Sequence, residues 1–553
     1  MKDSPTQTAA KKARLQSLVP WLIFFGALFV FTTRMRSEFL MIDTRFALFV
    51  HEMKETGVVF WPTLYGKAYP DYTGLPTFLS LLAAELTGKV DYFSLVLPSA
   101  VAGAFLIVMT WQTGVRLFNA ALAAAAVLLM FCSFEFVGIC RISSIDLYPA
   151  LATLCAFYVT AVGVRENHDR RVYWTLVLLA AGYAARGPIG LVVPAAVVCG
   201  TLLVERKYAL MIRFAVCAGI LLAALAALWG LIIFRFGGEE LLRESFSMQV
   251  SHRMSKGKPP WYYFTNAAGS FALTYPAALG IIVLYAAVFR KKLLEPGPLR
   301  SFADCAAYLL VVVLGFSIPG TKHLRYITPL IPAAALLTAH LVWNPQRIGL
   351  LRKVRKLFFF LAAICPWLAV PVFLGAQLVL LHPAVAEKIG SVIHLPLLPG
   401  TIMLVLLCLL VVCSKHLGRY RRLALLAVVA GLVTFVRIML IEPVEASTMS
   451  SRGFTLRCEQ LRGDRIPLFF ALGPDGDENK YMINIRRARA FVPRYANDDV
   501  LAGLPPDSLV IARMDKWKQD PRKWRVLARG RIGRRNCALL MKKGTAAPAP
   551  KHP

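Results

Sequence analysis

Metal-binding and redox cysteine motifs are missing from this chain, although it contains 11 cysteines. No two of them have CxxC spacing, which makes a zinc ribbon or a thioredoxin-like site unexpected. Nine lie in or beside apolar stretches, where cysteine packs as a small hydrophobe. The other two, Cys458 and Cys537, lie near the C-terminus.

Acidic residues are also scarce, since 31 Asp and Glu stand against 63 Lys and Arg and give a formal net charge of +32. Such a charge would ordinarily suggest nucleic-acid binding. However, 57% of the residues are hydrophobic and the mean hydropathy is +0.58, which indicates a membrane protein. Most of the basic residues lie in loops where they would face anionic lipid, so we expect no nucleic-acid partner.

Two further absences concern the apolar region. The first apolar stretch has no small-residue cleavage site, so we interpret it as a retained anchor. No internal repeat is visible, which weakens the case for a transporter built from paired halves.

Long apolar stretches fill residues 1–441, and we predict a mainly α-helical membrane domain there. Alternate connections carry clusters of Lys and Arg, which the positive-inside rule places in the cytoplasm. The N-terminus is then cytoplasmic and the C-terminus extracytoplasmic. The two short spans that meet near residues 185–188 could also be one broken helix. The thirteen predicted spans are 17–33, 92–110, 119–136, 147–164, 172–185, 187–204, 211–234, 264–289, 303–319, 326–343, 357–380, 397–413 and 422–441.

Two regions lie outside these spans. The first outer loop, residues 34–91, is long and has helical apolar spacing in two places, so we expect interfacial helices there. Residues 442–553 contain short apolar runs separated by Gly, Pro and Asp, which predict a small extracytoplasmic α/β domain with a disordered tail. In that oxidising compartment we predict a Cys458–Cys537 disulfide, with two separate buried thiols as the alternative.

The ionisable residues at the ends of the spans fall on the outer side, opposite to the basic loops. Such residues are expensive to place near lipid and indicate a functional site on the extracytoplasmic face. They are Asp43, Asp71, Arg141, Asp146, Arg186, His252, Lys322, His323 and Arg325.

Five segments in this outer region resemble motifs of one family. IDTRFALFVHEMKETG with YGKAYPDYTGLP, CRISSIDLYPAL, RGPIGLVVP, KPPWYYF and TKHLRYITPLIPAAALL occur in the family's order. The chain thus resembles the ArnT and protein O-mannosyltransferase group of GT-C glycosyltransferases. The predicted span count and outer C-terminal domain also look like ArnT.

This resemblance implies a GT-C fold and transfer of a sugar from a polyprenyl-phosphate carrier, with inversion, to an extracytoplasmic acceptor at the inner membrane. The leading acceptor is lipid A, with aminoarabinose as the sugar. A protein O-glycosyltransferase and a polysaccharide-modifying enzyme are alternatives. From other classes, a polyprenyl-linked sugar flippase or transporter and a structural assembly factor stay open. We expect a monomer.

The chemistry requires a carboxylate base and positive charge around the leaving phosphate. Asp43 and Asp146 are the candidate catalytic carboxylates. The family usually has Asp-Glu where this chain has Ile42-Asp43, which leaves open which carboxylate is the base. Each Asp could instead cap a helix.

A metal site is a further expectation. Asp71 stands where the family has a Glu proposed to bind metal, and Tyr72 replaces a Lys that contacts phosphate. His252 is the only His in the large outer loop, and a His-carboxylate site would suit Zn²⁺ or Mn²⁺. A surface role is the alternative for His252, as it is for Lys256 and Lys258. The candidates for binding phosphate or substrate are Arg45, Tyr72, Arg141, Arg186, Lys256, Lys258, Lys322, His323, Arg325 and Tyr326.

Overall fold

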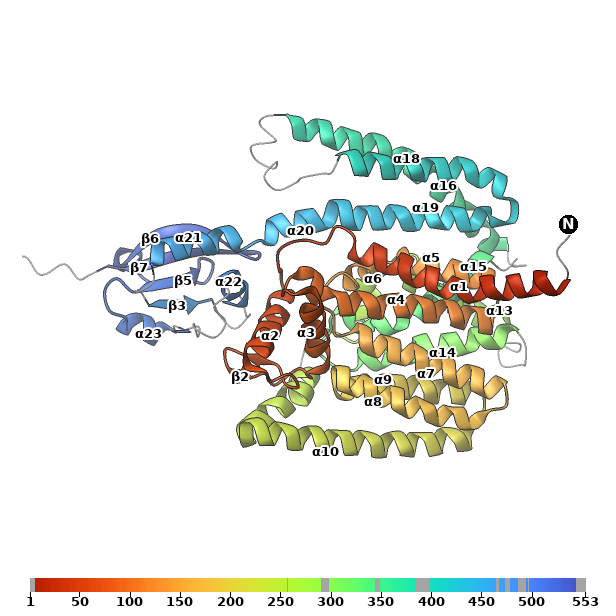
Figure 1. Ribbon diagram of the computed structural model, residues 1–553, viewed down its shortest axis with the longest axis horizontal. Coiled ribbons are helices and arrows are strands. Elements are labelled where there is room, and N and C mark those ends of the chain that lie inside the picture. The colour runs from red at the N-terminus through yellow and green to blue at the C-terminus, as the bar shows by residue number, and fades with distance from the viewer. Residues whose placement is uncertain are drawn as a thin grey trace, which may run out of the picture.

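The computed structural model describes residues 5–255, 257–289, 298–343, 349–382, 397–463, 467–472, 478–485, 494–495 and 497–543, and most of them are helical (Figure 1). The helices in the first half are α1 (Pro5–Thr32), α2 (Asp43–Thr56), α3 (Leu75–Thr87), α4 (Tyr92–Leu117), α5 (Ala120–Phe131), α6 (Phe134–Ile139), α7 (Leu147–Arg165), α8 (Thr175–Arg186), α9 (Pro188–Val204), α10 (Tyr208–Phe246), α11 (His252–Met254), α12 (Tyr262–Ser270) and α13 (Tyr275–Phe289). Those in the second half are α14 (Pro298–Ser317), α15 (Ile331–Trp343), α16 (Gly349–Leu381), α18 (Leu397–Ser414), α19 (Arg421–Phe435), α20 (Glu442–Met449), α21 (Arg452–Arg462), α22 (Glu478–Ile485) and α23 (Asp498–Gly503).

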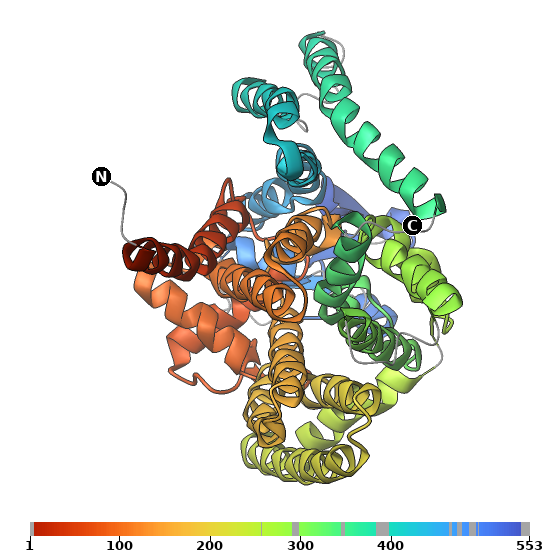
Figure 2. The same cartoon turned by 90° about the vertical axis from the view of Figure 1, so that its right-hand side faces the viewer.

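The apolar helices form a bundle whose long axes run the same way (Figures 1 and 2). Its centre is built from α4, α5, α7 and α15, which pack on one another and share one hydrophobic core. Among the described residues, eight helices are long and apolar enough to cross a membrane. The prediction of a mainly α-helical membrane protein is therefore confirmed, while the number of thirteen spans stays a prediction.

The chain reverses between α8 and α9, so the alternative of one broken helix is wrong. Gly187 has φ +70° between the two helices, a conformation that favours glycine. Gly182 and Gly190 then face each other so closely that a Cβ on either would collide with the carbonyl oxygen of the other. Two separate helices result, packed side by side.

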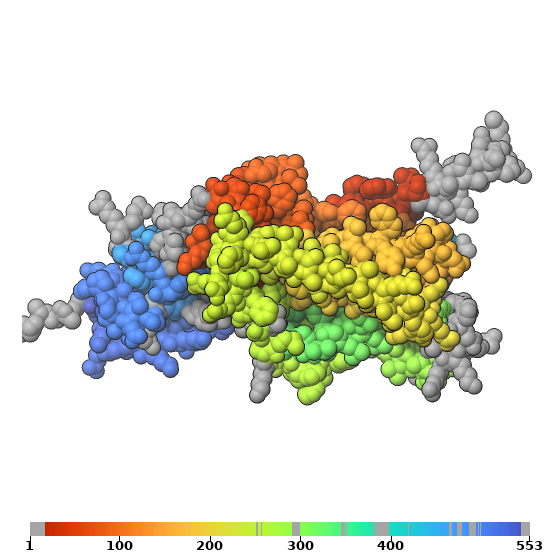
Figure 3. Space-filling view, turned by 90° about the horizontal axis from the view of Figure 1, so that it is seen from below, coloured from red at the N-terminus to blue at the C-terminus, as the bar shows by residue number. Residues whose placement is uncertain are grey.

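Two other spans differ from their predicted limits. The predicted span 264–289 is divided into α12 and α13, with Leu273 at φ +66° between them. The helix α10 is 39 residues long and continues well past residue 234, with a change of direction at Gly238 (φ +67°). Figure 3 shows α10 stretched across one side of the bundle, and its apolar residues are largely exposed, as expected for a lipid-facing helix.

The first outer loop contains the two helices expected there, α2 and α3, joined through the short hairpin of β1 (Thr63–Leu64) and β2 (Lys67–Ala68). Glu52 holds this hairpin, because its carboxylate accepts hydrogen bonds from the Thr63 hydroxyl at 2.7 Å and from the backbone amides of Tyr65 and Gly66. The loop is thus a folded unit at one end of the bundle.

The C-terminal region forms a five-stranded sheet in the order β4-β3-β5-β7-β6. β3 is parallel to β4 and β5, whereas β7 is antiparallel to β5 and β6. One face packs on α21 and α22, and the other packs on α23. The strands are β3 (Leu468–Ala471), β4 (Arg494–Tyr495), β5 (Leu509–Arg513), β6 (Trp524–Ile532) and β7 (Arg535–Lys542).

This sheet sits against the end of the bundle that carries α2, opposite the end where α1 begins (Figure 1). Helices α2 and α22 are in contact, and one hydrophobic cluster includes residues of both as well as the inner face of the sheet. The Tyr65 hydroxyl also donates a hydrogen bond of 2.5 Å to Asn479 Oδ1. The C-terminal region therefore covers the first outer loop.

Candidate functional site

A polar pocket of about 410 Å³ opens at the end of the bundle next to α2. It is formed where the start of α2, helix α6 and the segment after α14 meet, and α20 contributes one wall. Both signs of charge line it, which is typical of a site that binds a polar ligand. Its acidic and basic lining residues are Arg36, Asp43, Glu135, His323, Arg325, Arg437 and Glu445.

Asp43 is the most deeply buried carboxylate of this polar pocket, with 1% of its surface exposed. Its Oδ1 accepts a hydrogen bond of 2.9 Å from the backbone amide of Ser143, and Oδ2 lies 3.3 Å from Arg36 Nη2. No side-chain capping bond is made at the start of α2, so the capping alternative for Asp43 fails. Burial raises the pKa of Asp43, and Arg36 and the Ser143 amide offset only part of this effect.

Asp146 joins two arginines that come from distant parts of the chain. Its Oδ1 accepts a hydrogen bond of 3.1 Å from Arg186 Nε, and its Oδ2 lies 3.2 Å from Arg325 Nε. It makes no capping bond to α7. We call Asp146, Arg186 and Arg325 the Asp146 bridge. Because Arg325 also lines the polar pocket with 27% of its side chain exposed, the bridge reaches a ligand there.

An apolar groove of about 200 Å³ lies on the other side of the Asp146 bridge. Its walls are valine- and isoleucine-rich faces of α9 and α14, and Tyr326 and Arg253 stand at its polar end. A small cavity lined by Asp146, Arg186 and Tyr326 adjoins it. The Tyr326 ring centroid is 5.9 Å from the guanidinium carbons of both bridge arginines, so the groove ends against positive charge.

Arg253 is a residue that the sequence reasoning missed. Its Nη2 lies 2.9 Å from Asp71 Oδ1, while its buried Nη1 has no hydrogen-bond partner among the described residues. A buried guanidinium nitrogen without a partner is costly, so an anion at this point would satisfy it. The position immediately after His252 was the only signal in the sequence.

Comparisons with known proteins identify the fold. Residues 74–232 match the family model described as dolichyl-phosphate-mannose-protein mannosyltransferase. The crystal structure of ArnT from Cupriavidus metallidurans in the apo state is similar over 96% of this chain and 98% of that chain, with a TM-score of 0.67 and 17% sequence identity. The chain has the GT-C fold of ArnT. The structure of the same protein bound to undecaprenyl phosphate gives a TM-score of 0.66.

Two curated relatives are undecaprenyl phosphate-alpha-4-amino-4-deoxy-L-arabinose arabinosyl transferases. The one from Sodalis glossinidius is 26% identical over 340 residues, 58% of this chain and 58% of the relative. The one from Pseudomonas fluorescens is 22% identical over 372 residues, 64% of this chain and 62% of the relative. The chain thus matches about three fifths of the length of these relatives, and the predicted resemblance to the ArnT-like group is confirmed.

The structure corrects the interpretation of Arg141 as a phosphate-binding residue. Its Nε and Nη2 bind the Glu442 carboxylate at 2.7 and 2.8 Å, and Nη1 donates to the carbonyl oxygens of Val30 and Phe31. Arg141 is 2% exposed and does not line the polar pocket. These contacts give it the structural task of joining α1 to α20.

Two lysines also have structural contacts. The ammonium of Lys322 donates to the carbonyl oxygens of Lys258 and Pro319, and that of Lys258 donates to the carbonyl oxygen of Lys322 at 2.7 Å. This reciprocal pair holds two outer segments together and leaves Lys322 2% exposed. It does not favour phosphate binding by Lys322. Lys256 lies outside the described residues.

Of the remaining residues predicted to bind phosphate or substrate, some pack against other side chains and one lines the polar pocket. Arg45 Nη1 donates to the Tyr69 hydroxyl at 2.8 Å, away from both cavities. The Tyr72 ring stacks on Phe46 and faces Arg186, at 5.8 Å from its guanidinium carbon. His323 lines the polar pocket, and its role in binding substrate stays a prediction.

The metal hypothesis gains no support from the contacts of Asp71. Arg253 and Gln249 both donate to its Oδ1, so this oxygen is already engaged by a positive charge and an amide. The side chain of His252 lies outside the described residues. No group of three His, Cys, Asp or Glu side chains suited to a metal occurs in the part of the chain that the structure describes. Metal binding stays a prediction and has no part in the mechanism below.

The cysteine pair Cys458 and Cys537 is buried in one hydrophobic cluster between α21 and the sheet. Phe454, one turn before Cys458, packs on Gly530, whose register partner on β7 is Cys537. The two residues thus share one interface, and their disulfide stays a prediction.

Proposed function

We propose that this protein transfers a sugar from a polyprenyl-phosphate carrier to an acceptor on the extracytoplasmic side of the inner membrane, with residues 442–553 as an extracytoplasmic domain. The observation that carries the proposal is that three features adjoin one another through shared residues. An apolar groove ends at the Asp146 bridge, and the bridge continues into a polar pocket with the buried Asp43.

The groove suits the carrier. A polyprenyl chain has no hydrogen-bonding groups along its length, and the walls on α9 and α14 are apolar. Its phosphate would meet Arg253 at the polar end, where Nη1 lacks a protein partner, and the nearby bridge arginines. Guanidinium groups bind phosphate by bidentate, charge-assisted hydrogen bonds. The ArnT structure bound to undecaprenyl phosphate, which shares this fold, supports a carrier of this class.

The polar pocket suits the acceptor. In the proposed step an acceptor oxygen attacks the anomeric carbon while the bond from that carbon to the carrier phosphate breaks. The phosphate leaves with the electron pair and is stabilised by Arg325 and Arg186 of the bridge. When the acceptor is a hydroxyl, its proton goes to Asp43. Burial raises the pKa of Asp43 and so makes this carboxylate a stronger base than an exposed Asp.

The roles of the two candidate carboxylates therefore differ. Asp146 is held between two arginines, and each of its carboxylate oxygens already meets one of them. We assign it the positioning of Arg186 and Arg325. Asp43 faces the pocket with one ion-pair partner, Arg36, and we assign it the base.

The acceptor proposed first is the phosphorylated sugar of lipid A, because both curated relatives are aminoarabinose transferases. A protein hydroxyl is second, because the family model matched by residues 74–232 is described as a protein mannosyltransferase. The charges of the site lie at one end of the bundle, and a flippase would place them near the middle of the membrane.

The test is mass spectrometry of lipid A and of envelope glycoproteins from cells with the wild-type protein, with Asp43→Asn, and without the gene. We expect a sugar addition that depends on the wild-type protein and is lost without the gene. Where the acceptor is a hydroxyl, Asp43→Asn should lose it as well. Loss of carrier translocation with unchanged transfer chemistry would refute the enzyme and favour the flippase. A sugar found on proteins but not on lipid A would show that a protein hydroxyl, and not lipid A, is the acceptor.

A further inference from the structure

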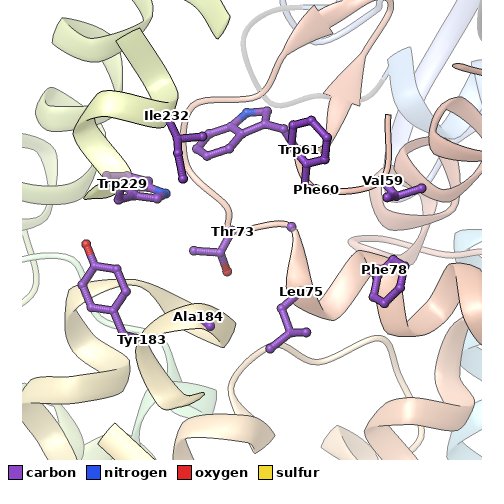
Figure 4. Close-up of a pocket in the computed structure, with 11 residues that line it drawn as sticks. Val59, Phe60, Trp61, Thr73, Leu75, Phe78, Tyr183, Ala184, Trp229 and Ile232 are labelled. Carbon is purple, nitrogen blue, oxygen red and sulfur yellow. The ribbon is translucent and has the colours of Figure 1, made fainter. Parts of the chain in front are cut away.

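A second apolar cavity, the aromatic pocket, lies apart from the groove and the polar pocket (Figure 4). Its volume of about 390 Å³ is within the usual range for small-molecule sites. It lies between the first outer loop, the end of α8 and the lipid-facing helix α10. The lining residues are Val59, Phe60, Trp61, Thr73, Gly74, Leu75, Phe78, Tyr183, Ala184, Trp229 and Ile232.

The walls of this pocket are held in place without a ligand. The rings of Trp61 and Trp229 lie 5.9 Å apart, and the Trp61 indole donates to the Tyr69 carbonyl oxygen at 3.1 Å. Gly74 is required because a Cβ there would collide with the Phe60 backbone. The Ser245 hydroxyl donates to the Pro70 carbonyl oxygen and so ties the loop to α10. The pocket is preformed.

Three polar atoms of this otherwise apolar lining lack hydrogen-bond partners in the described structure. They are the Thr73 hydroxyl, the Tyr183 hydroxyl and the Trp229 indole nitrogen. Tyr183 is 4% exposed and Thr73 is 9% exposed, so water does not readily serve them. Each such group destabilises the fold when it stays unpaired, and three of them around one cavity indicate a ligand with a hydrogen-bonding oxygen.

The chemistry of the lining selects among lipids. A polyprenyl chain would fill the apolar space and leave all three polar atoms unpaired. An acyl chain brings its own ester or amide carbonyl, which accepts from an indole N–H and from hydroxyl groups. The exposed apolar surface of α10 beside the pocket gives such a chain access from the membrane.

We propose that the aromatic pocket binds one acyl chain of a membrane lipid, with the linkage carbonyl at Thr73, Tyr183 and Trp229. This site is separate from the polyprenyl groove and does not depend on the transfer reaction. Two of its lining residues are close in sequence to residues at the Asp146 bridge. Thr73 follows Tyr72, whose ring contacts Arg186, and Tyr183 precedes Arg186 by one helical turn. An acyl chain in the pocket would fix both sides of the Tyr72–Arg186 contact.

The experiment uses the full-length protein in nanodiscs of phosphatidylethanolamine and phosphatidylglycerol. A trace of phosphatidylethanolamine with a diazirine in one ester-linked acyl chain is photoactivated, and labelled peptides are mapped by mass spectrometry. We expect labels in residues 59–61, 73–78, 183–184 and 229–232. A diether lipid with the same diazirine chain lacks the carbonyl and should label these peptides about tenfold less, as expected for the loss of one or two hydrogen bonds.

The variant Thr73→Val/Tyr183→Phe keeps the pocket shape and removes both hydroxyls. It should lower labelling by the ester lipid by about tenfold and leave labelling by the diether lipid unchanged. Tyr208→Phe, which changes an exposed tyrosine at the start of α10, is the matched control and should label as wild type. Thermal unfolding of each variant checks that the fold is retained.

Competition identifies the source of the chain. Displacement of the probe by lipid A would assign the pocket to an acylated acceptor, and displacement by phosphatidylglycerol alone would assign it to a bulk lipid. Both outcomes support the acyl site. Equal labelling by ester and diether lipids, displacement by undecaprenyl phosphate, or absence of labels from these peptides would overturn it. Labelling of the pocket does not require sugar transfer. If the wild-type protein showed no transferase activity but these peptides were still labelled, the proposed function would be rejected and the acyl site would stand.

Discussion

The replacement Asp43→Asn is the sharpest perturbation of the proposed mechanism. Asn has nearly the same shape, and its Oδ1 can still accept the hydrogen bond from the Ser143 amide that Asp43 accepts at 2.9 Å. What it loses is the ability to take a proton. General-base catalysis typically contributes about 10²- to 10⁴-fold, so we expect kcat for a hydroxyl acceptor to fall by about that factor.

The pH dependence gives an independent check with a defined sign. The pKa of Asp43 in the folded protein is raised above its ordinary value of 3.8, mainly by burial. The base form is lost as the pH falls through this raised pKa, so wild-type kcat should decline on the acidic side at a pH above that value. In Asp43→Asn, the residual rate should lack this acidic limb.

The same shift predicts the effect on stability. The stability linked to a group with a raised folded pKa is present below its unfolded pKa and is lost as the pH rises through its folded pKa. At neutral pH the buried Asp43 charge is therefore a net cost, and neutral Asn should not lower the thermal midpoint. A fall in activity with an unchanged midpoint separates catalysis from unfolding.

The assay is sugar release from the carrier in nanodiscs, followed by mass spectrometry of the product between pH 4 and pH 9. Glu52→Gln is the matched control, because Glu52 is a buried carboxylate on the same helix that supports the β1–β2 hairpin. It should lower the thermal midpoint and keep the acidic limb. Wild-type kcat in Asp43→Asn with the acidic limb intact would refute the assignment of Asp43 as the base.

Three further predictions follow from contacts in the structure. Arg325→Gln should weaken binding of undecaprenyl phosphate by about tenfold or more, since a charge-assisted contact contributes about 1.5–3 kcal/mol. Lys322→Met should lower the thermal midpoint and leave that binding unchanged. Equal weakening of binding in both variants would show that Lys322 also binds the phosphate. Arg141→Met should destabilise the fold by about 1.5–3 kcal/mol, because it removes the two short contacts to the buried Glu442 carboxylate and leaves it only Arg437 at 3.6 Å. Adding Glu442→Leu should recover much of the loss in thermal unfolding, and no recovery would contradict the structural role. Non-reducing peptide mapping of protein from an oxidising compartment should find the cysteine pair linked, and alkylation of both thiols in the unfolded, unreduced protein would contradict this.

Much of the fold was predictable because lipid imposes simple rules. Apolar stretches of span length with basic residues in alternate connections indicate a helical membrane protein, and the eight long apolar helices agree. The limits of α8 and α9 were harder to predict. Their separation depends on the contact of Gly182 with Gly190, a tertiary feature that hydropathy does not encode.

The candidate site was predictable in composition but not in pairing. The sequence indicated which charges lie on the outer side, but not that Arg141 is neutralised by Glu442, which is 301 positions away. A lone arginine at a span end has the same sequence signal whether it binds a phosphate or a carboxylate of its own chain. Arg36 and Arg437, both lining the polar pocket, were missed for the converse reason, because neither lies in a segment that resembles a family motif.

The pairing pattern also determines which charges remain for a ligand. In Arg141 and Lys322 the donors already meet carboxylate or carbonyl oxygens, so these cations stabilise the scaffold. Arg253 keeps one buried nitrogen without a partner, and Arg325 meets its carboxylate while exposed to the polar pocket. A phosphate placed between the groove and the pocket would find its positive charge at these two residues. For this reason the Asp146 bridge, rather than the number of basic residues on the outer side, indicates that the groove and the pocket serve one reaction.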